Sequence, residues 1–429
     1  MMIYLISFLS PFISIFNFII QIMLVRYFGL SEILDIYFLS LSLPILFSQT
    51  IHAGFSYGIM PMLAKSDENS SKIYSNQIFL VFCIGISLIF LIATLFVDIQ
   101  LNFYSKFNSL NLDDFKIVFI LAWFYGALTV VLAALGTIFI AEKKYFQGIL
   151  LPFSPQLGLF ILLLFGSQLS VSWLLLSSII GAIVGVMFSL KGIYIYLNSI
   201  FDLKLSFEIF KPYLIKILYA GIGSSIFGSY LFIDSLLAIQ FGTGSLTALG
   251  YSQRIVIGFG NIAILGIFTV AIPELMESLR KRRWQGFRNE YLSLMKKALS
   301  FSLILSIFIL LFINFFIEFF FISENFSQSD ADSLSNIVKY MLPGMVAMLA
   351  TAINCKALYC LEDFKIISVF IGFAWPAIYS FFIIYFRDLN LISFGIAYSI
   401  SWIIIFLVTF SYIFMKISFE VNKDKQLKI

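Results

Sequence analysis

The feature that most constrains this sequence is a series of apolar runs, each about 20 residues long, separated by short polar breaks. A helix of that length crosses the hydrocarbon core of a bilayer, which is about 30 Å thick. Only 12% of the residues are charged, whereas a soluble domain carries about 25%. The chain is therefore predicted to be an all-α polytopic membrane protein.

Twelve spans are expected, which puts both termini on the same side of the membrane. The first run has no basic start and no small-residue cleavage site, so we interpret it as a span and not as a signal peptide. We place the spans near residues 2–25, 36–60, 77–97, 116–140, 149–166, 171–197, 213–240, 247–273, 299–322, 335–360, 366–386 and 391–415.

The distribution of Lys and Arg predicts the orientation. Of the 27 basic residues, 20 lie in or near the breaks after even-numbered spans or in the C-terminal tail, five lie in or near odd-numbered breaks, and Arg254 and Lys356 are assigned to spans. Basic residues concentrate in cytoplasmic loops, so both termini are expected in the cytoplasm. The abundance of Phe, Ile, Asn and Lys suits an AT-rich bacterial genome, and we expect a multi-pass protein of the bacterial inner membrane.

An internal duplication divides the chain into two halves. Phe28-Gly29 and Pro61 recur as Phe241-Gly242 and Pro273, at offsets of 213 and 212 residues. Two further pairs follow in the same order, Glu142 with Glu362 and Pro155 with Pro376, at offsets of 220 and 221 residues. We therefore expect two six-helix lobes, residues 1–205 and 206–429, related by an axis along the membrane normal. Many secondary transporters built in this way hold substrate between the lobes.

Ionisable side chains within the predicted spans mark candidate binding groups, because a charge at membrane depth is costly and usually faces a cavity or a partner. Arg254 lies in the eighth span, and its planar guanidinium suits a phosphate group. Asp234 lies in the seventh span. Two interpretations stay open and are compatible: Arg254 binds an anionic headgroup, or Arg254 and Asp234 form an ion pair that joins the two spans.

Two further pairs of polar residues lie at helical spacing in the first two spans. Asn17 and Gln21 are one helical turn apart, and Gln49 and His52 are three residues apart, so each pair shares a face. They are candidate substrate-binding residues on the wall of the N-terminal lobe. Hydrogen bonds between helices are an equally good explanation. Near them, Asp35 flanks the first outer loop, where we expect it to stabilise a helix N-terminus.

Other functional classes find little support. The three cysteines have no zinc or redox spacing and there is a single histidine, so neither a metal site nor a cofactor is expected. No Walker-type phosphate loop is present. The longest predicted outer breaks, near 98–115 and 323–334, are short for a membrane glycan polymerase or glycosyltransferase. We expect no enzyme activity and no nucleic-acid partner, and we expect a monomer.

The segment from Arg26 to Phe38, followed by Pro44 and Pro61, resembles the lipid II flippases of the MurJ/MviN type. These belong to the superfamily of multidrug, oligosaccharidyl-lipid and polysaccharide exporters. A second match runs from Ile233 to Leu237 and on to Arg254. The resemblance implies a V-shaped cavity between two lobes and a polyprenyl-pyrophosphate-linked sugar as cargo. It also implies that Arg254 matches an arginine of the central cavity.

The sequence departs from that family in two ways. Lipid II flippases carry further arginines in the first two helices, where this chain has Ser14, Ile20 and Phe47 to Gln49, and they usually have fourteen spans. The departures favour a relative that exports an O-antigen, capsule or exopolysaccharide unit. Lipid II itself is the alternative cargo, and a multidrug cation antiporter is a weaker hypothesis. Membrane potential, or a proton or sodium gradient, is the expected source of energy.

Overall fold

The computed structural model describes residues 2–63, 85, 87, 89–105, 113–141, 144–166, 170–197, 219, 221–223, 226–280, 284–361 and 363–426. Among these residues there are helices and turns and no β-strand. The chain divides into two compact units, Met1–Thr247 and Ala248–Ile429. The lobe boundary expected near residue 205 lies outside the described residues.

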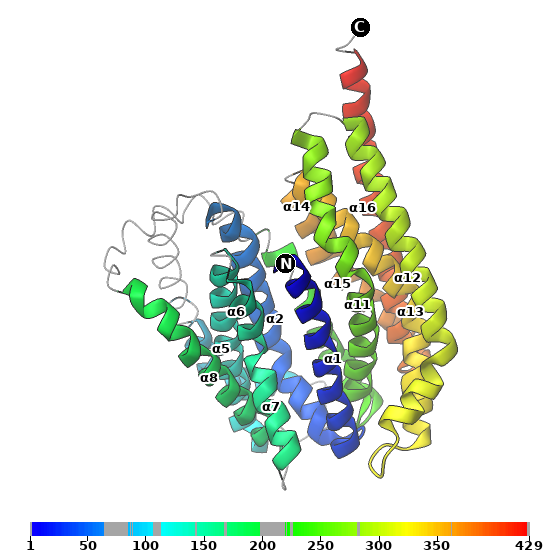
Figure 1. Cartoon of the computed structure of the whole chain (residues 1–429). Coiled ribbons are helices and arrows are strands. Elements are labelled where there is room, and N and C mark those ends of the chain that lie inside the picture. The colour runs from blue at the N-terminus through cyan, green and yellow to red at the C-terminus, as the bar shows by residue number, and fades with distance from the viewer. Residues whose placement is uncertain are drawn as a thin grey trace. The chain divides into compact units, whose positions relative to one another are not determined.

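The first unit is a bundle of long apolar helices with shorter pieces between them (Figure 1). The helix α2 packs against α5 and α10, and α8 packs against α5 and α7. The helices of this unit are α1 (Met2–Phe28), α2 (Glu32–Leu63), α4 (Val97–Ser105), α5 (Lys116–Ala141), α6 (Tyr145–Leu150), α7 (Ser154–Phe165), α8 (Val171–Leu197) and α10 (Ile226–Leu237).

The second unit is built around α13, which packs against both α12 and α16. The helix α11 begins in the first unit and continues through the second. The helices here are α11 (Ser245–Arg280), α12 (Trp284–Phe321), α13 (Gln328–Cys360), α14 (Phe364–Ile367), α15 (Trp375–Tyr385) and α16 (Ile392–Gln426), and a π-helical segment, Ser368–Ala374, joins α14 to α15.

Eight helices in the described part of the chain are long and apolar enough to cross a membrane, which confirms the predicted all-α membrane fold. They are Glu32–Phe55, Lys116–Ile140, Phe146–Phe165, Val171–Ser189, Trp284–Phe321, Gln328–Cys360, Lys365–Tyr385 and Ile392–Lys423, with two shorter apolar helices at Phe12–Phe28 and Ser229–Phe241. The first part of the expected span near 77–97 lies outside the described residues, and the span near 247–273 falls within α11.

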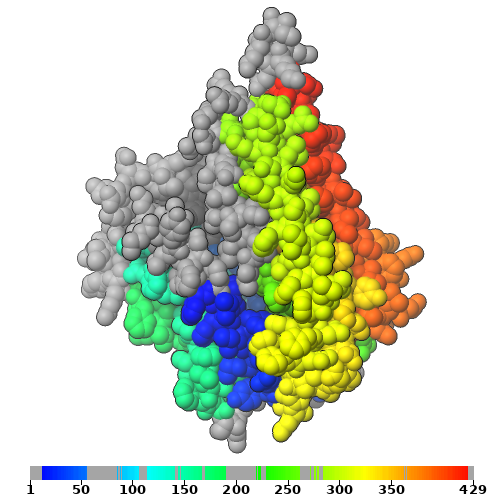
Figure 2. Space-filling view, turned by 45° about the vertical axis from the view of Figure 1, so that its right-hand side comes forward, coloured from blue at the N-terminus to red at the C-terminus, as the bar shows by residue number. Residues whose placement is uncertain are grey.

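The helix α12 lies at the surface of the second unit (Figure 2), and its C-terminal half, residues 301–319, exposes a broad apolar face. Only 17% of its most apolar 18-residue stretch is buried. This stretch is nevertheless the most hydrophobic among the eight spanning helices, with a mean hydropathy of 2.6. Large exposed side chains such as Leu311 and Phe315 lie on this face. In water such a surface would be unstable, so this face is suited to contact with lipid.

The duplicated glycines have the same backbone role in both repeats. Gly29 follows the end of α1 with a φ of 61°, and its N–H donates to the carbonyl of Val25. Gly242 follows the turn Ala238–Phe241 with a φ of 109°. A positive φ favours glycine because it has no Cβ. Each Phe-Gly pair therefore ends one helix before the next begins, as its sequence position suggested.

The duplicated prolines also occupy equivalent positions. Pro155 is the second residue of α7, after the 3₁₀ turn Leu151–Phe153, and Pro376 is the second residue of α15, after the π-helical segment. Proline has no N–H and its ring crowds the preceding turn, so it disturbs the regular hydrogen bonding of a helix that continues through it. Both prolines therefore begin an α-helix after a segment of different helical geometry, and the two halves share this break.

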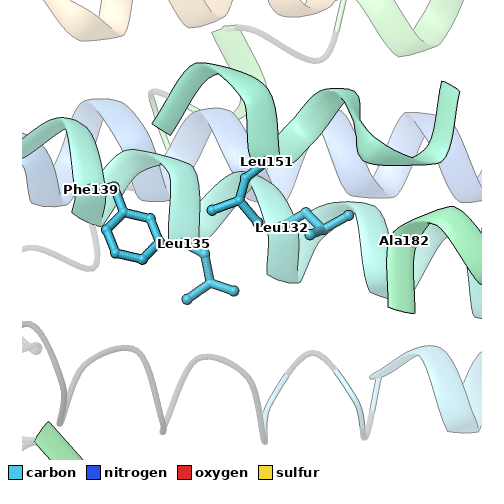
Figure 3. Close-up of a cluster of buried hydrophobic side chains, with 5 residues drawn as sticks. All are labelled: Leu132, Leu135, Phe139, Leu151 and Ala182. Atoms are coloured by element: carbon cyan, nitrogen blue, oxygen red, sulfur yellow. The ribbon is translucent and has the colours of Figure 1, made fainter. Parts of the chain in front are cut away.

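Small residues bring the helices of the first unit close together. A Cβ on Gly158 of α7 would lie 2.1 Å from the carbonyl oxygen of Ser177 in α8, and one on Gly181 would lie 2.5 Å from that of Ser154. Close backbone approach of this kind is a main source of packing between membrane helices. Next to it lies an apolar cluster (Figure 3) of Leu132, Leu135, Phe139, Leu151 and Ala182.

Candidate functional site

The candidate binding residue Arg254 lies on the open side of an otherwise buried stretch of helix. From Gly244 to Val256 every residue is buried except Arg254, which is half-buried. Four residues further on, and so on the same face of α11, a Cβ added to Gly258 would meet no atom within 4 Å. The guanidinium therefore lies on the face of α11 that has open space beside it.

Packing within the second unit holds α11 on either side of the Arg254 position. Tyr251 is 1% exposed, and its ring meets that of Phe321 edge-on at 6.5 Å. A Cβ on Gly260 would lie 3.3 Å from Leu349 of α13. These contacts fix the rotation of α11 about its own axis. Because the rotation is fixed, Arg254 is directed to the open face and a long, charged side chain is not forced into the core.

Asp234 is fully buried in α10, with 1% of its surface exposed. It belongs to the first unit and Arg254 to the second. The structure thus places both residues in helices at the expected positions, and their pairing stays a prediction.

The two polar pairs of the first unit lie on helices with different neighbours. Asn17 and Gln21 are half-buried in α1, which packs against α6 and α7. Gln49 is exposed and His52 is half-buried in α2, which packs against α5 and α10. Each pair keeps partial access, as a binding wall requires, and their joint action on one substrate stays a prediction.

The best-defined polar contact is made by Asp35, in the first turn of α2. Its carboxylate is 1% exposed and accepts three hydrogen bonds: from the N–H of Gly244 at 2.5 Å, from the N–H of Thr247 at 2.8 Å and from the Thr247 hydroxyl at 2.6 Å. These backbone groups lie at the N-terminus of α11, where the first N–H groups have no partner within the helix and the dipole is positive. Asp35 therefore caps α11 from a distance of 209 residues along the chain.

The sequence interpretation gave Asp35 a helix-stabilising role, and the structure adds which helix it stabilises. One signal for the partner was present. The residue before α11 is Gly244, which has no side chain to accept a hydrogen bond, and the first turn of α11 contains no acidic residue. The start of this helix thus required an acceptor from elsewhere. The close approach is possible because a Cβ on Gly244, whose φ is 82°, would lie 2.8 Å from Leu30.

A second polar cluster, which the sequence did not indicate, joins α2, α4 and α5. The hydroxyl groups of Tyr104 and Ser42 are 2.5 Å apart, and Ser42 donates its proton to the carbonyl of Leu39, so Tyr104 is the donor to Ser42. Burial raises the pKa of Tyr104 to about 12, which keeps the phenol protonated. Beside it, the indole N–H of Trp123 donates to Gln100 at 2.8 Å. These bonds fasten the short helix α4 to the bundle.

Comparisons with solved structures identify the fold. A lipid II flippase MurJ in an inward closed conformation matches with a TM-score of 0.81 and 16% identity, over 97% of this chain and 90% of the other. An inward-facing multidrug transporter of the MATE family matches with a TM-score of 0.81 and 15% identity, over 97% and 99%. A superfamily transporter from Pyrococcus furiosus matches with a TM-score of 0.67 and 16% identity, over 97% and 94%. No curated protein matches by sequence.

The sequence itself also matches a family model. The model described as "Lipid II flippase MurJ" covers residues 24–429. This range includes both segments on which the resemblance was based and all the described residues of α11. It leaves out only the first part of α1. The chain is therefore a member of the lipid II flippase MurJ family of membrane transporters.

Proposed function

We propose that this protein is a flippase that moves a polyprenyl-pyrophosphate-linked oligosaccharide from the inner to the outer leaflet of the bacterial inner membrane. The family match over residues 24–429 is the observation that carries the proposal. The task needs no covalent chemistry. The protein must shelter a charged sugar headgroup in its interior while the lipid tail stays in the bilayer.

In the proposed architecture, two six-helix lobes enclose a V-shaped cavity that opens to each side of the membrane in turn, and both termini are cytoplasmic. The equivalent positions of Gly29 and Gly242, and of Pro155 and Pro376, support two repeated lobes. The excess of basic residues at even-numbered breaks supports the orientation. Because no nucleotide-binding loop is present, membrane potential or a proton or sodium gradient is the proposed source of energy.

Within this cavity, Arg254 is the proposed pyrophosphate ligand. Its support is the open face of α11 described above, together with a charge that is fixed at all physiological pH values and a planar fork that matches phosphate oxygens. Asn17, Gln21, Gln49 and His52 are proposed to receive sugar hydroxyl groups. Asp234 is proposed as the counter-ion of Arg254 while the site holds no substrate.

Two cargoes are candidates, and different observations favour them. The shortage of arginines in the first two helices and the twelve expected spans favour an O-antigen, capsule or exopolysaccharide unit. The description of the matching family favours lipid II. Both cargoes present a pyrophosphate next to a sugar. They differ in the glycan beyond it, where the polar pairs of α1 and α2 would bind.

A depletion experiment tests the proposal and separates the cargoes. When expression of the protein is shut off in its own host, a lipid-linked saccharide is expected to accumulate on the cytoplasmic face, and its composition identifies the glycan. Complementation of a strain without its lipid II flippase would instead select lipid II. If depletion changes no lipid-linked saccharide and complementation fails, the proposed function is wrong.

The site assignment needs its own test. Arg254→Ala is expected to abolish export while the protein still inserts, and Arg254→Lys is expected to retain part of it, because a lysine keeps the charge but loses the fork. Lys296→Ala is the matched control, since it removes a positive charge from an exposed position on α12. Normal export by Arg254→Ala would exclude Arg254 as the headgroup ligand.

A further inference from the structure

Two helices of the second unit, α13 and α16, approach each other closely through a glycine on each. A Cβ on Gly344 would lie 2.5 Å from the ring of Tyr398 and 2.7 Å from the Cα of Ser399. A Cβ on Gly395 would lie 2.8 Å from the Cβ of Tyr340. No other residue type fits at either position without a shift of backbone or ring. The approach brings the side chain of Ser399 against the backbone of α13.

The hydroxyl of Ser399 contacts both the N–H and the carbonyl that would pair with each other in one turn of α13. It accepts a hydrogen bond from the N–H of Gly344 at 2.9 Å and donates one to the carbonyl of Tyr340 at 2.5 Å. In a continuous α-helix, the N–H of residue 344 donates to the carbonyl of residue 340. Ser399 is therefore placed so that it can bridge this pair of groups when the turn widens.

The neighbouring turn of α13 is weakened by a proline. Pro343 lies within α13, well away from either end. It has no N–H to offer to the carbonyl of Lys339, and its ring crowds that carbonyl. Proline, and side chains that insert into the ladder of helical bonds, are two of the usual causes of a bend in a long helix. Here both occur at adjacent residues.

The two parts of α13 on either side of this point are each stabilised separately. At the N-terminal end, Ser327 and Asp330 form a capping box that stabilises the first turn of the helix. In the C-terminal half, the buried side chain of Asn354 accepts a hydrogen bond from the Tyr291 hydroxyl at 2.7 Å and donates one to Thr409 at 2.8 Å. These bonds tie the C-terminal half to α12 and α16. The turn between the two halves is therefore the point where α13 bends most easily.

We infer that residues 339–344 of α13 form a hinge, and that Ser399 of α16 carries the hydrogen bond of this turn when the hinge opens. If the buried N–H and carbonyl separated without a substitute partner, each would lose its hydrogen bond, and the free-energy cost would make the open form rare. The hydroxyl removes that obstacle, since it already touches both groups. The inference rests on the proposed function in one respect: the hinge would serve the change of access from one side of the membrane to the other.

The first test compares flipping rates in proteoliposomes with a fluorescent undecaprenyl-pyrophosphate-linked disaccharide as probe. Ser399→Ala is expected to slow flipping about tenfold, whereas Ser399→Thr keeps the hydroxyl and retains more activity. Ser401→Ala is the matched control, because Ser401 is also buried in α16 but donates only to Ala397 of its own helix. If the parent protein flips the probe, equal rates for the alanine variants at 399 and 401 would overturn the hinge.

A double-mutant cycle separates a hinge from simple packing. Pro343→Ala restores the missing N–H, so the helix has less need of the bridge. The effect of Ser399→Ala is then expected to be clearly smaller in the Pro343→Ala background. If Ser399→Ala instead slows flipping by the same factor in the parent protein and in Pro343→Ala, Ser399 acts through packing alone and the inference is refuted.

A measurement without substrate keeps the hinge testable if the probe is not the cargo. Spin labels at the exposed Ser333 of α13 and Ser300 of α12, in a variant without the three native cysteines, report the distance between the N-terminal half of α13 and the N-terminal half of α12. The parent protein is expected to give a broad or two-component distribution, and Ser399→Ala a narrower one. An unchanged distribution would reject the hinge. A narrowed distribution without flipping of the probe would reject only the proposed cargo.

Discussion

Replacement of Asp35 by Asn tests the cap on α11 with almost no change in shape. One oxygen of the carboxylate accepts both bonds from Thr247 and the other accepts the bond from Gly244. The amide oxygen of asparagine can keep the two bonds to Thr247. The amide nitrogen then faces the N–H of Gly244, so a donor meets a donor where an acceptor is needed.

The size of the effect follows from the contacts that are lost. A hydrogen bond to a charged group contributes about 1.5–3 kcal/mol, and a negative charge at a helix N-terminus contributes about 0.3–1 kcal/mol, or up to ~2 kcal/mol when partly buried. Asp35→Asn is therefore expected to lower the free energy of unfolding by about 2–4 kcal/mol. In a protein of 429 residues such a change lowers Tm by about 2–4 °C.

The assay is thermal unfolding of the purified protein in nanodiscs, followed by tryptophan fluorescence. Glu32→Gln is the matched control, since Glu32 lies in the same first turn of α2, is exposed and loses the same charge. Thr247→Val removes one donor of the same cap, so its effect should be smaller when combined with Asp35→Asn. If Asp35→Asn unfolds at the same temperature as Glu32→Gln, the carboxylate does not hold the start of α11 and the reasoning fails.

Two further substitutions probe the packing of the first unit. Tyr104→Phe removes the donor to Ser42 and is expected to lower the free energy of unfolding by about 1–2 kcal/mol, measured as a shift in Tm. Gly158→Ala puts a methyl group 2.1 Å from the Ser177 carbonyl oxygen and is expected to reduce the yield of monodisperse protein in size-exclusion chromatography, whereas Gly258→Ala, with no atom within 4 Å, should leave the yield unchanged. Equal yields of the two glycine variants would contradict the close packing of α7 and α8.

The sequence was sufficient for the features that depend on local composition. Apolar runs located the spans, because backbone groups in lipid must be paired within a helix. The duplication identified positions such as Gly29 and Gly242, whose backbone role is set by the residue itself. Arg254 was selected as a candidate for a similar reason, since a charge within an apolar span is costly, and its binding role stays a prediction.

The remaining features depend on which helices face each other, and local composition does not specify this. Ser399 and Ser401 are two residues apart in the same apolar stretch of α16, and nothing in the sequence distinguishes them. In the structure Ser399 contacts the backbone of α13, and Ser401 bonds only within its own helix. The difference arises because the glycine contacts between α13 and α16 set the register and rotation of the two helices.

The two repeats also differ at the point where their second helices begin. In the first repeat, the first turn of α2 contains Glu32 and Asp35. In the second repeat, the first turn of α11 contains no acid, and its N–H groups bond instead to Asp35 of the first repeat. One carboxylate in the first turn of α2 therefore serves as the cap of α11. This contact explains why the first three residues of α11 belong to the first compact unit. It also means that the second repeat cannot begin its helix in the native way without the first, so any movement of α11 that carries Arg254 must either keep this cap or break it.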